Sequence, residues 1–317
     1  MAKSAFAKTD VPSQIVRPRG NPFDLGDNAS YGAWRAAKLA AYPNDISEIT
    51  IAIGDLAAPT AEEKSAIVTA CQRANMAVYV TRPTPRNGAE TDAEMRRSLR
   101  QFASAFGLGG MEQHRSAEDD GIVAIEVTEA ESKRAFIPYT KRALSWHTDG
   151  YYNSPDRAIK AMLLHCVRPA LEGGINALLD PEIAYIRLRD KGTALIAAMM
   201  HPEAMTIPEA QEEDGSIRPV STGPVFFVDA AGSLTMRYTA RTRNISWRDD
   251  DDTRAAVSFL DRLLAHEEEP LIIKHKLGQG EGLISNNSLH TRTAFENGAT
   301  SARLLYRVRY RERIEGT

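Results

Sequence analysis

The change at residue 121 to short strand-like runs separated by turns constrains the fold of this chain most. The candidate strands lie at 122–127, 158–166, 225–228, 234–238, 271–277, 282–286 and 303–313. Two helical stretches interrupt them, at 181–200 and 253–266. Many short strands with few inserted helices are typical of two packed sheets whose interior can hold a metal ion. We therefore predict a mainly β protein with flanking helices, built as a double-stranded β-helix (jelly roll).

The first part of the chain is predicted to be a scaffold of helices and strands beside this β region. Residues 1–28 are expected to form an extended arm, and helices are expected at 30–41, 60–74 and 92–106, with strands at 49–53 and 76–81. Thr60 and Glu63 have the spacing of a capping box, which supports the start of the second helix. We expect an N-terminal arm and helix at 1–45 and a single jelly-roll domain at 46–317.

Residues 200–223 form a long, polar stretch that contains several prolines. Stretches of this length without secondary structure, inside a compact domain, are usually functional lids or segments without order. A lid over the mouth of the jelly roll is one interpretation of residues 200–223, and a surface loop without a role is the other.

The composition argues against several classes of protein. With 317 residues and a net charge of −3, the chain lacks the basic excess of a nucleic-acid-binding protein. We find no run of 18 apolar residues and no apolar signal segment in residues 1–20. Cys71 and Cys166 are too few for a disulfide framework and are expected to be buried thiols. The expectation is a cytoplasmic protein that binds a small molecule, neither nucleic acid nor membrane, and is compatible with a homo-oligomer.

His147, Asp149 and His290 are candidate metal ligands. His147 and Asp149 are separated by one residue, and residues i and i+2 of a strand point to the same side. The distant His290 could complete a set of two histidines and one carboxylate, which is typical of non-haem Fe(II) oxygenases. Three of the seven histidines have an acid at i+2, namely His147, His201 and His266. His201 and His266 fall at the ends of the two predicted helices, where residues i and i+2 do not face each other. The His-x-Asp pattern alone is weak, and a structural histidine beside a turn aspartate is the alternative.

The last predicted strand carries arginines at alternate positions. Arg303 and Arg307 share one face of it and lie ~13 Å apart at the rise of a β-strand. A guanidinium group can bind a carboxylate through two parallel hydrogen bonds. One interpretation makes the arginine face solvated, and the other places it inside the jelly roll, where the two arginines bind two separate anions. Arginines 309–313 are expected to emerge into solvent.

Four motifs, in this order and at this spacing, give the chain a family resemblance. They are Leu144-Ser-Trp-His-Thr-Asp-Gly150, Arg168-Pro-Ala-Leu-Glu-Gly-Gly174, Asn286-Asn-Ser-Leu-His-Thr-Arg292 and Arg303-Leu-Leu-Tyr-Arg307. From about residue 57 to its C-terminus, the chain resembles the taurine dioxygenase family of Fe(II)/2-oxoglutarate enzymes, which includes clavaminate synthase-like and glutarate hydroxylase-like members. The resemblance implies that His147, Asp149 and His290 bind Fe(II).

The resemblance also favours a lid at residues 200–223, and it implies roles for residues around the metal. Arg303 is similar to the arginine that binds the distal carboxylate of 2-oxoglutarate, and Arg307 to the one that binds the substrate anion in taurine dioxygenase. The threonine that the family usually carries after its Gly-Gly pair is replaced by Asn176, whose amide can still donate a hydrogen bond. Further candidates for the substrate pocket are Tyr151, Tyr139 and Arg237.

These roles predict an enzyme that uses Fe(II), 2-oxoglutarate and O2. It would hydroxylate a C–H bond of a small carboxylate or sulfonate and release succinate and CO2, with desaturation and ring closure left open. Two other classes stay open: a zinc-type metallohydrolase with the same ligands, and a non-catalytic, cupin-like binding protein. A zinc hydrolase has no use for a buried Arg303, and a binding protein would not release succinate.

Overall fold

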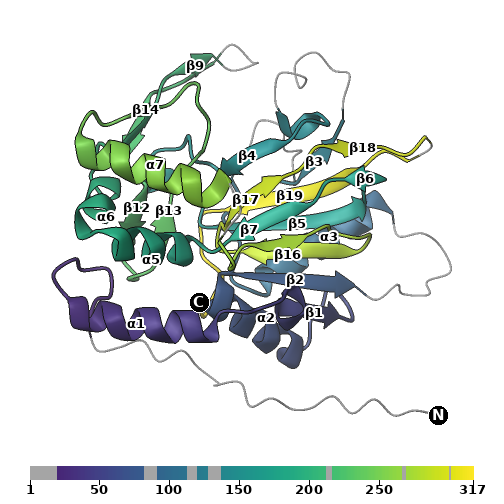
Figure 1. Ribbon diagram of the computed structural model, residues 1–317. Coiled ribbons are helices and arrows are strands. Elements are labelled where there is room, and N and C mark those ends of the chain that lie inside the picture. The colour runs from purple at the N-terminus through teal and green to yellow at the C-terminus, as the bar shows by residue number, and fades with distance from the viewer. Residues whose placement is uncertain are drawn as a thin grey trace.

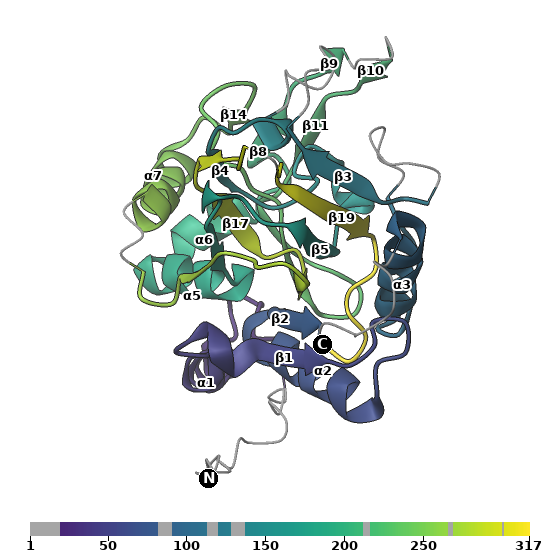
Figure 2. The ribbon, with the colours of Figure 1, turned by 90° about the vertical axis from the view of Figure 1, so that its right-hand side faces the viewer.

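The computed structural model describes residues 20–81, 91–112, 120–127, 137–211, 216–265, 269–299 and 301–317, and two β-sheets form its body. The larger sheet runs, in spatial order, β1 (Thr50–Ile53), β2 (Met76–Thr81), β16 (Glu281–Ser285), β5 (Ala161–Arg168), β19 (Leu304–Tyr310) and β3 (Val123–Glu126). The smaller sheet runs β15 (Ile273–His275), β7 (Asn176–Leu179), β17 (Leu289–Arg292) and β4 (Leu144–His147). In Figure 2, β4 and β17 lie on one side and β19 and β3 on the other. The predicted mainly β architecture with flanking helices is confirmed.

Strand β19 is buried along its whole length because both of its faces are covered. Its even-numbered face packs under helix α3 (Asp92–Ser104), where the Arg96 guanidinium lies 4.9 Å from the centre of the Tyr306 ring. Its odd-numbered face points between the sheets, where Arg307 contacts Asp149. The interior placement of the arginine face is thus confirmed. The expectation that Arg309 emerges into solvent was wrong, because Arg309 is 4% exposed and pairs with Glu112.

The helices begin where local signals predict. Helix α2 (Ala61–Ala74) starts with the predicted capping box of Thr60 and Glu63. The stretch predicted as one helix at 181–200 is two helices, α5 (Pro181–Lys191) and α6 (Thr193–Met199), separated at Gly192. Helix α7 (Asp251–Ala265) packs beside them, as Figure 1 shows. None of the helices in the described ranges has the length and apolar character that a membrane span requires.

Helix α1 (Asn28–Ala41) is fastened to this body by a buried ion cluster. The Lys38 ammonium group lies 2.6 Å from Asp180 and also contacts Glu182 at the start of α5. Lys38 and Asp180 are both fully buried, so this contact ties the N-terminal helix firmly to the fold. Residues 1–19 of the predicted arm lie outside the described residues.

The stretch predicted as a lid at 200–223 contains short strands, which corrects the expectation of a structureless loop. These strands are β8 (Met205–Ile207), β9 (Ala210–Gln211), β10 (Ile217–Arg218) and β11 (Ser221–Gly223). Strands β9 and β10 pair as a hairpin, whereas β8 lies between β11 and β14 (Ser246–Trp247). The hairpin projects from the top of the molecule in Figures 1 and 2. The remaining two-strand sheets are β12 (Phe226–Val228) with β13 (Leu234–Met236), and β6 (Glu172–Gly173) with β18 (Phe295–Glu296).

Candidate metal centre and active site

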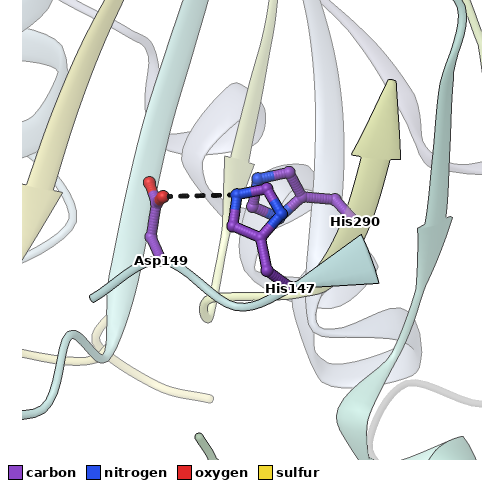
Figure 3. Close-up of side chains that lie close together, drawn as sticks. All are labelled: His147, Asp149 and His290. Atoms are coloured by element: carbon purple, nitrogen blue, oxygen red, sulfur yellow. Dashed lines mark ion pairs between the residues drawn. The ribbon is translucent and has the colours of Figure 1, made fainter. Parts of the chain in front are cut away.

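Strand pairing brings the two candidate histidine ligands together. In the antiparallel pair of β4 and β17, His147 lies directly opposite His290, and their ring centres are 4.3 Å apart. Asp149 follows two residues after His147, with its carboxylate turned toward the rings (Figure 3). One potential ligand atom from each of the three residues lies within 4.8 Å of the others. The site lies between the two sheets.

Hydrogen bonds to backbone carbonyls orient the rings of the two histidines. Nδ1 of His147 lies 2.8 Å from the Ser145 carbonyl, and Nδ1 of His290 lies 2.9 Å from the Ser288 carbonyl. Because a carbonyl only accepts hydrogen bonds, each Nδ1 carries the proton and each Nε2 presents its lone pair. Burial, and then the neighbouring His290, lowers the pKa of His147 to about 3. His147 is therefore neutral near pH 7.

Asp149 is an ionised carboxylate with an unused acceptor. Burial opposes its ionisation, but the guanidinium of Arg307 and then that of Arg309 keep the pKa of Asp149 below its usual value. Arg307 Nη1 lies 3.3 Å from Oδ1 of Asp149. The second oxygen, Oδ2, is buried and has no hydrogen-bond partner among the described residues. A buried acceptor normally has a partner, and a cation bound by both histidines would provide it. The donor set therefore fits Fe(II).

Arg303 is buried beside an aromatic ring and the Gly-Gly turn. Its guanidinium is 4.9 Å from the centre of the Phe295 ring, and its Nε lies 3.8 Å from the position that a Cβ on Gly174 would take. Burial lowers the pKa of Arg303 to about 10. Among the described residues, no carboxylate pairs with Arg303, and the guanidinium remains charged near pH 7. A buried cation of this kind suits a carboxylate ligand.

Arg292 is a site residue that sequence reasoning missed. It faces the same side of β17 as His290, and its guanidinium lies 4.7 Å from the Phe295 ring that Arg303 also contacts. It donates a hydrogen bond of 3.1 Å to the Thr140 carbonyl. Asn176 on β7 pairs in register with Arg292, and its Nδ2 donates to the His275 carbonyl at 3.4 Å. The i+2 spacing from His290 was the signal that could have identified Arg292.

A cavity of about 820 Å³ opens next to the three ligands. Tyr139 and Tyr151 line it together with Arg307, and the Tyr151 ring lies 6.4 Å from that of His147. The structure places Arg237 elsewhere: its guanidinium donates to the backbone carbonyls of residues 153, 205 and 221. Those bonds connect strands β8 and β11 to the turn at residue 153, and Arg237 is not among the residues that line the cavity.

Comparison with known proteins places the chain in a family. The model of the taurine catabolism dioxygenase TauD/TfdA family matches residues 92–309. The chain belongs to the TauD/TfdA family. It is therefore a 2-oxoglutarate-dependent non-haem iron dioxygenase, as predicted, and the zinc hydrolase and the non-catalytic binding protein are set aside.

Two curated relatives share one name, uridine-5'-phosphate dioxygenase. This chain is 32% identical to the relative from Amycolatopsis sp over 176 residues, which are 53% of the chain and 60% of that relative. It is 30% identical to the relative from Streptomyces sp over 241 residues, which are 69% of the chain and 80% of that relative. The chain thus spans about three fifths of the first relative's length and four fifths of the second.

A solved structure supports the fold. The non-heme iron oxygenase OrfP, solved in complex with Fe and alpha-ketoglutaric acid, matches with a TM-score of 0.55 at 17% identity. The match covers 76% of this chain and 76% of OrfP. At this identity, the likeness confirms the predicted jelly-roll fold.

Proposed function

We propose that this dioxygenase hydroxylates a C–H bond of a small phosphate ester, with uridine 5'-phosphate as the first candidate. The observation that carries the proposal is the charge of the cavity. Five arginines line it, at positions 157, 218, 241, 307 and 309, against three carboxylates, at positions 112, 149 and 209. One of these carboxylates, Asp149, is committed to the metal. Both curated relatives are named for uridine 5'-phosphate, and an excess of guanidinium groups suits a phosphate dianion.

The arginines of the cavity are engaged to different degrees. Arg309 pairs with Glu112, and Arg307 contacts Asp149, so both already have a carboxylate beside them. Arg241, in contrast, is exposed and donates a hydrogen bond of 2.9 Å to the neutral Tyr151 hydroxyl. A phosphate in the cavity would therefore meet Arg241 as an available cation, and Arg307 as a cation whose Nε has no hydrogen-bond partner among the described residues.

The uncharged walls of the cavity suit a flat ring. Tyr139, Tyr151 and Tyr152 line it beside the metal ligands, and Ile217 and Val220 line its mouth with side chains 64% and 59% exposed. Exposed apolar groups that face a cavity lose water when a ligand binds. A nucleoside offers both a planar base for these groups and a phosphate for the arginines.

The chemistry needs a metal that activates O2, and Fe(II) held by His147, Asp149 and His290 would supply that activation. O2 is the oxidant for both 2-oxoglutarate and the C–H bond. The protein contributes charge and position. Arg303 binds the distal carboxylate of 2-oxoglutarate, and Asn176, beside Arg292, adds a hydrogen bond. The cavity side chains place one C–H bond of the substrate toward the metal and exclude water, while succinate and CO2 leave.

We also propose that the protein works in the cytoplasm, since Cys71 and Cys166 are free and buried.

The test is substrate-stimulated release of succinate from the Fe(II)-loaded protein with 2-oxoglutarate and O2. We expect stimulation by uridine 5'-phosphate, weak or no stimulation by uridine, and none by inorganic phosphate alone, because the base and phosphate must bind together. Taurine, asparagine and arginine are tested in the same assay as candidate substrates of other chemical classes. Stimulation by one of these acids, with none by uridine 5'-phosphate, would overturn the proposed substrate and leave the dioxygenase class intact.

A further inference from the structure

The backbone of Asp149 is held by a side chain from the segment that carries His290. Asn287 Oδ1 accepts a hydrogen bond of 2.8 Å from the Asp149 N–H, and Asn287 Nδ2 donates one of 3.0 Å to the Asp149 carbonyl. The same Nδ2 donates a third bond, of 2.8 Å, to the Ile159 carbonyl. Asn287 is 4% exposed, so water does not compete with these bonds.

The position of Asp149 requires such a contact because the strand ends before it. β4 stops at His147, and Asp149 leads directly into Gly150, which has a φ of +66°. A Cβ on Gly150 would lie 2.4 Å from the Ile159 side chain, so the turn is also tightly packed. The Asn287 amide takes the place of the ladder hydrogen bonds that fix a residue inside a strand.

Asn287 itself has an unusual backbone conformation that fits this task. Its φ of +51° lies in the left-handed region, which Asn tolerates better than most residues with a side chain. The next residue, Ser288, provides the carbonyl that bonds Nδ1 of His290. One short segment therefore orients two metal ligands: Asp149 through a side chain and His290 through a backbone carbonyl.

We propose that Asn287 is the positioning residue of the metal centre, and that its amide couples the carboxylate ligand to the segment of the distal histidine. Contacts that orient metal ligands typically change metal affinity about 10–100-fold when they are removed. The proposal concerns metal binding alone and does not depend on the identity of the substrate.

Three variants separate the amide contact from the backbone conformation. Asn287→Gly keeps the left-handed conformation and removes the amide. Asn287→Asp keeps the size and the acceptor, but removes both N–H donors and places a negative charge beside two carbonyl oxygens. Asn286→Ala is the matched control, because Asn286 is equally buried and bonds Asn75 and Thr317 rather than a metal ligand.

Co(II) binding to the metal-free protein, followed by visible absorption, gives the dissociation constant without turnover. We expect about a 10–100-fold weaker Kd for Asn287→Gly and a loss at least as large for Asn287→Asp. For Asn286→Ala we expect a lower Tm with a Kd within about twofold of wild type. A backbone role alone predicts near-normal binding in both Asn287 variants.

Two results would overturn the proposal: a wild-type Co(II) Kd in Asn287→Gly, or an equal loss of affinity in Asn286→Ala. If Asn287→Gly does not fold, Asn287→Asp carries the test, because it preserves side-chain volume and tolerates the left-handed conformation. If the wild-type protein binds Co(II) but does not respond to uridine 5'-phosphate, that result counts against the proposed substrate only.

Discussion

The metal end of the active site and the mouth of the cavity are built in different ways. At the metal end, His147 and His290 sit on paired strands, and Arg303 is buried against Phe295. At the mouth, the two-residue strand β10 consists of Ile217 and Arg218, and Ile217 is 64% exposed. Paired strands hold ligands at fixed distances, whereas short edge segments leave side chains adjustable. The difference suggests that the common chemistry depends on the metal end and the choice of substrate on the mouth.

The largest effect is expected at the metal end itself. His290→Ala should abolish succinate release and Co(II) binding, because the described residues offer one cluster of three candidate ligands and losing one leaves too few. The Tm of the metal-free protein should change little, since His290 is only partly buried. His275→Ala is the control, because His275 bonds Glu281 and is not a candidate ligand. Turnover at the wild-type rate in His290→Ala would refute the ligand set.

The next largest effect is expected at Arg303, which we propose binds the distal carboxylate of 2-oxoglutarate. Arg303→Ala should raise the apparent KM for 2-oxoglutarate at least ~30-fold, because a buried carboxylate that loses its charged partner costs about 2–5 kcal/mol. Asn176→Ala should raise the same KM by about fivefold, as expected for one neutral hydrogen bond of about 1 kcal/mol. Co(II) affinity should be unchanged in both variants. An unchanged KM in Arg303→Ala would mean that the co-substrate carboxylate binds elsewhere.

Sequence reasoning reached much of the metal end because its ligands stand at regular spacings and its motifs are familiar. Among the three strands that hold the site, β7 and β17 were not predicted. β4 was inferred only from the spacing of His147 and Asp149, and it ends at His147. Each of the three strands has four residues. Polar or charged residues occupy most of their inward positions, with Leu178 as the apolar exception; they are Ser145, His147, Asn176, His290 and Arg292. The alternation that reveals a strand is therefore absent where the strand carries function.

Other features depend on contacts that spacing cannot reveal. The contact of His275 is one of these, because its Nε2 lies 2.8 Å from Glu281, six residues further along the chain and across a turn. Arg309 looked like part of a solvated end, but Glu112 pairs with it from a distant segment. At the mouth, the strands of residues 205–223 are too short for any periodic pattern. Tertiary contacts alone determine these positions.

Arg307 lies at the boundary of the two regions and tests whether they are separable. It contacts Asp149 and also lines the cavity. If it binds the substrate phosphate, Arg307→Ala should raise the substrate KM by about tenfold or more and favour succinate release without oxidised product. The weak visible band of the anaerobic Fe(II)/2-oxoglutarate complex should persist. Loss of that band would instead assign Arg307 to the metal end, through its contact with Asp149.

The smallest effect is expected at the mouth, where Arg241 is exposed and bonds the Tyr151 hydroxyl. An exposed rim cation acts mainly by long-range attraction, and salt screens that attraction. Arg241→Gln should therefore raise the KM for uridine 5'-phosphate about two- to fivefold at low salt and less at high salt. The KM for 2-oxoglutarate and the Co(II) Kd should not change. Tyr151→Phe, which removes the hydroxyl and keeps the cation, is the matched control and should leave the salt dependence intact. An equal shift in the KM for 2-oxoglutarate would mean that the mouth and the metal end do not act separately.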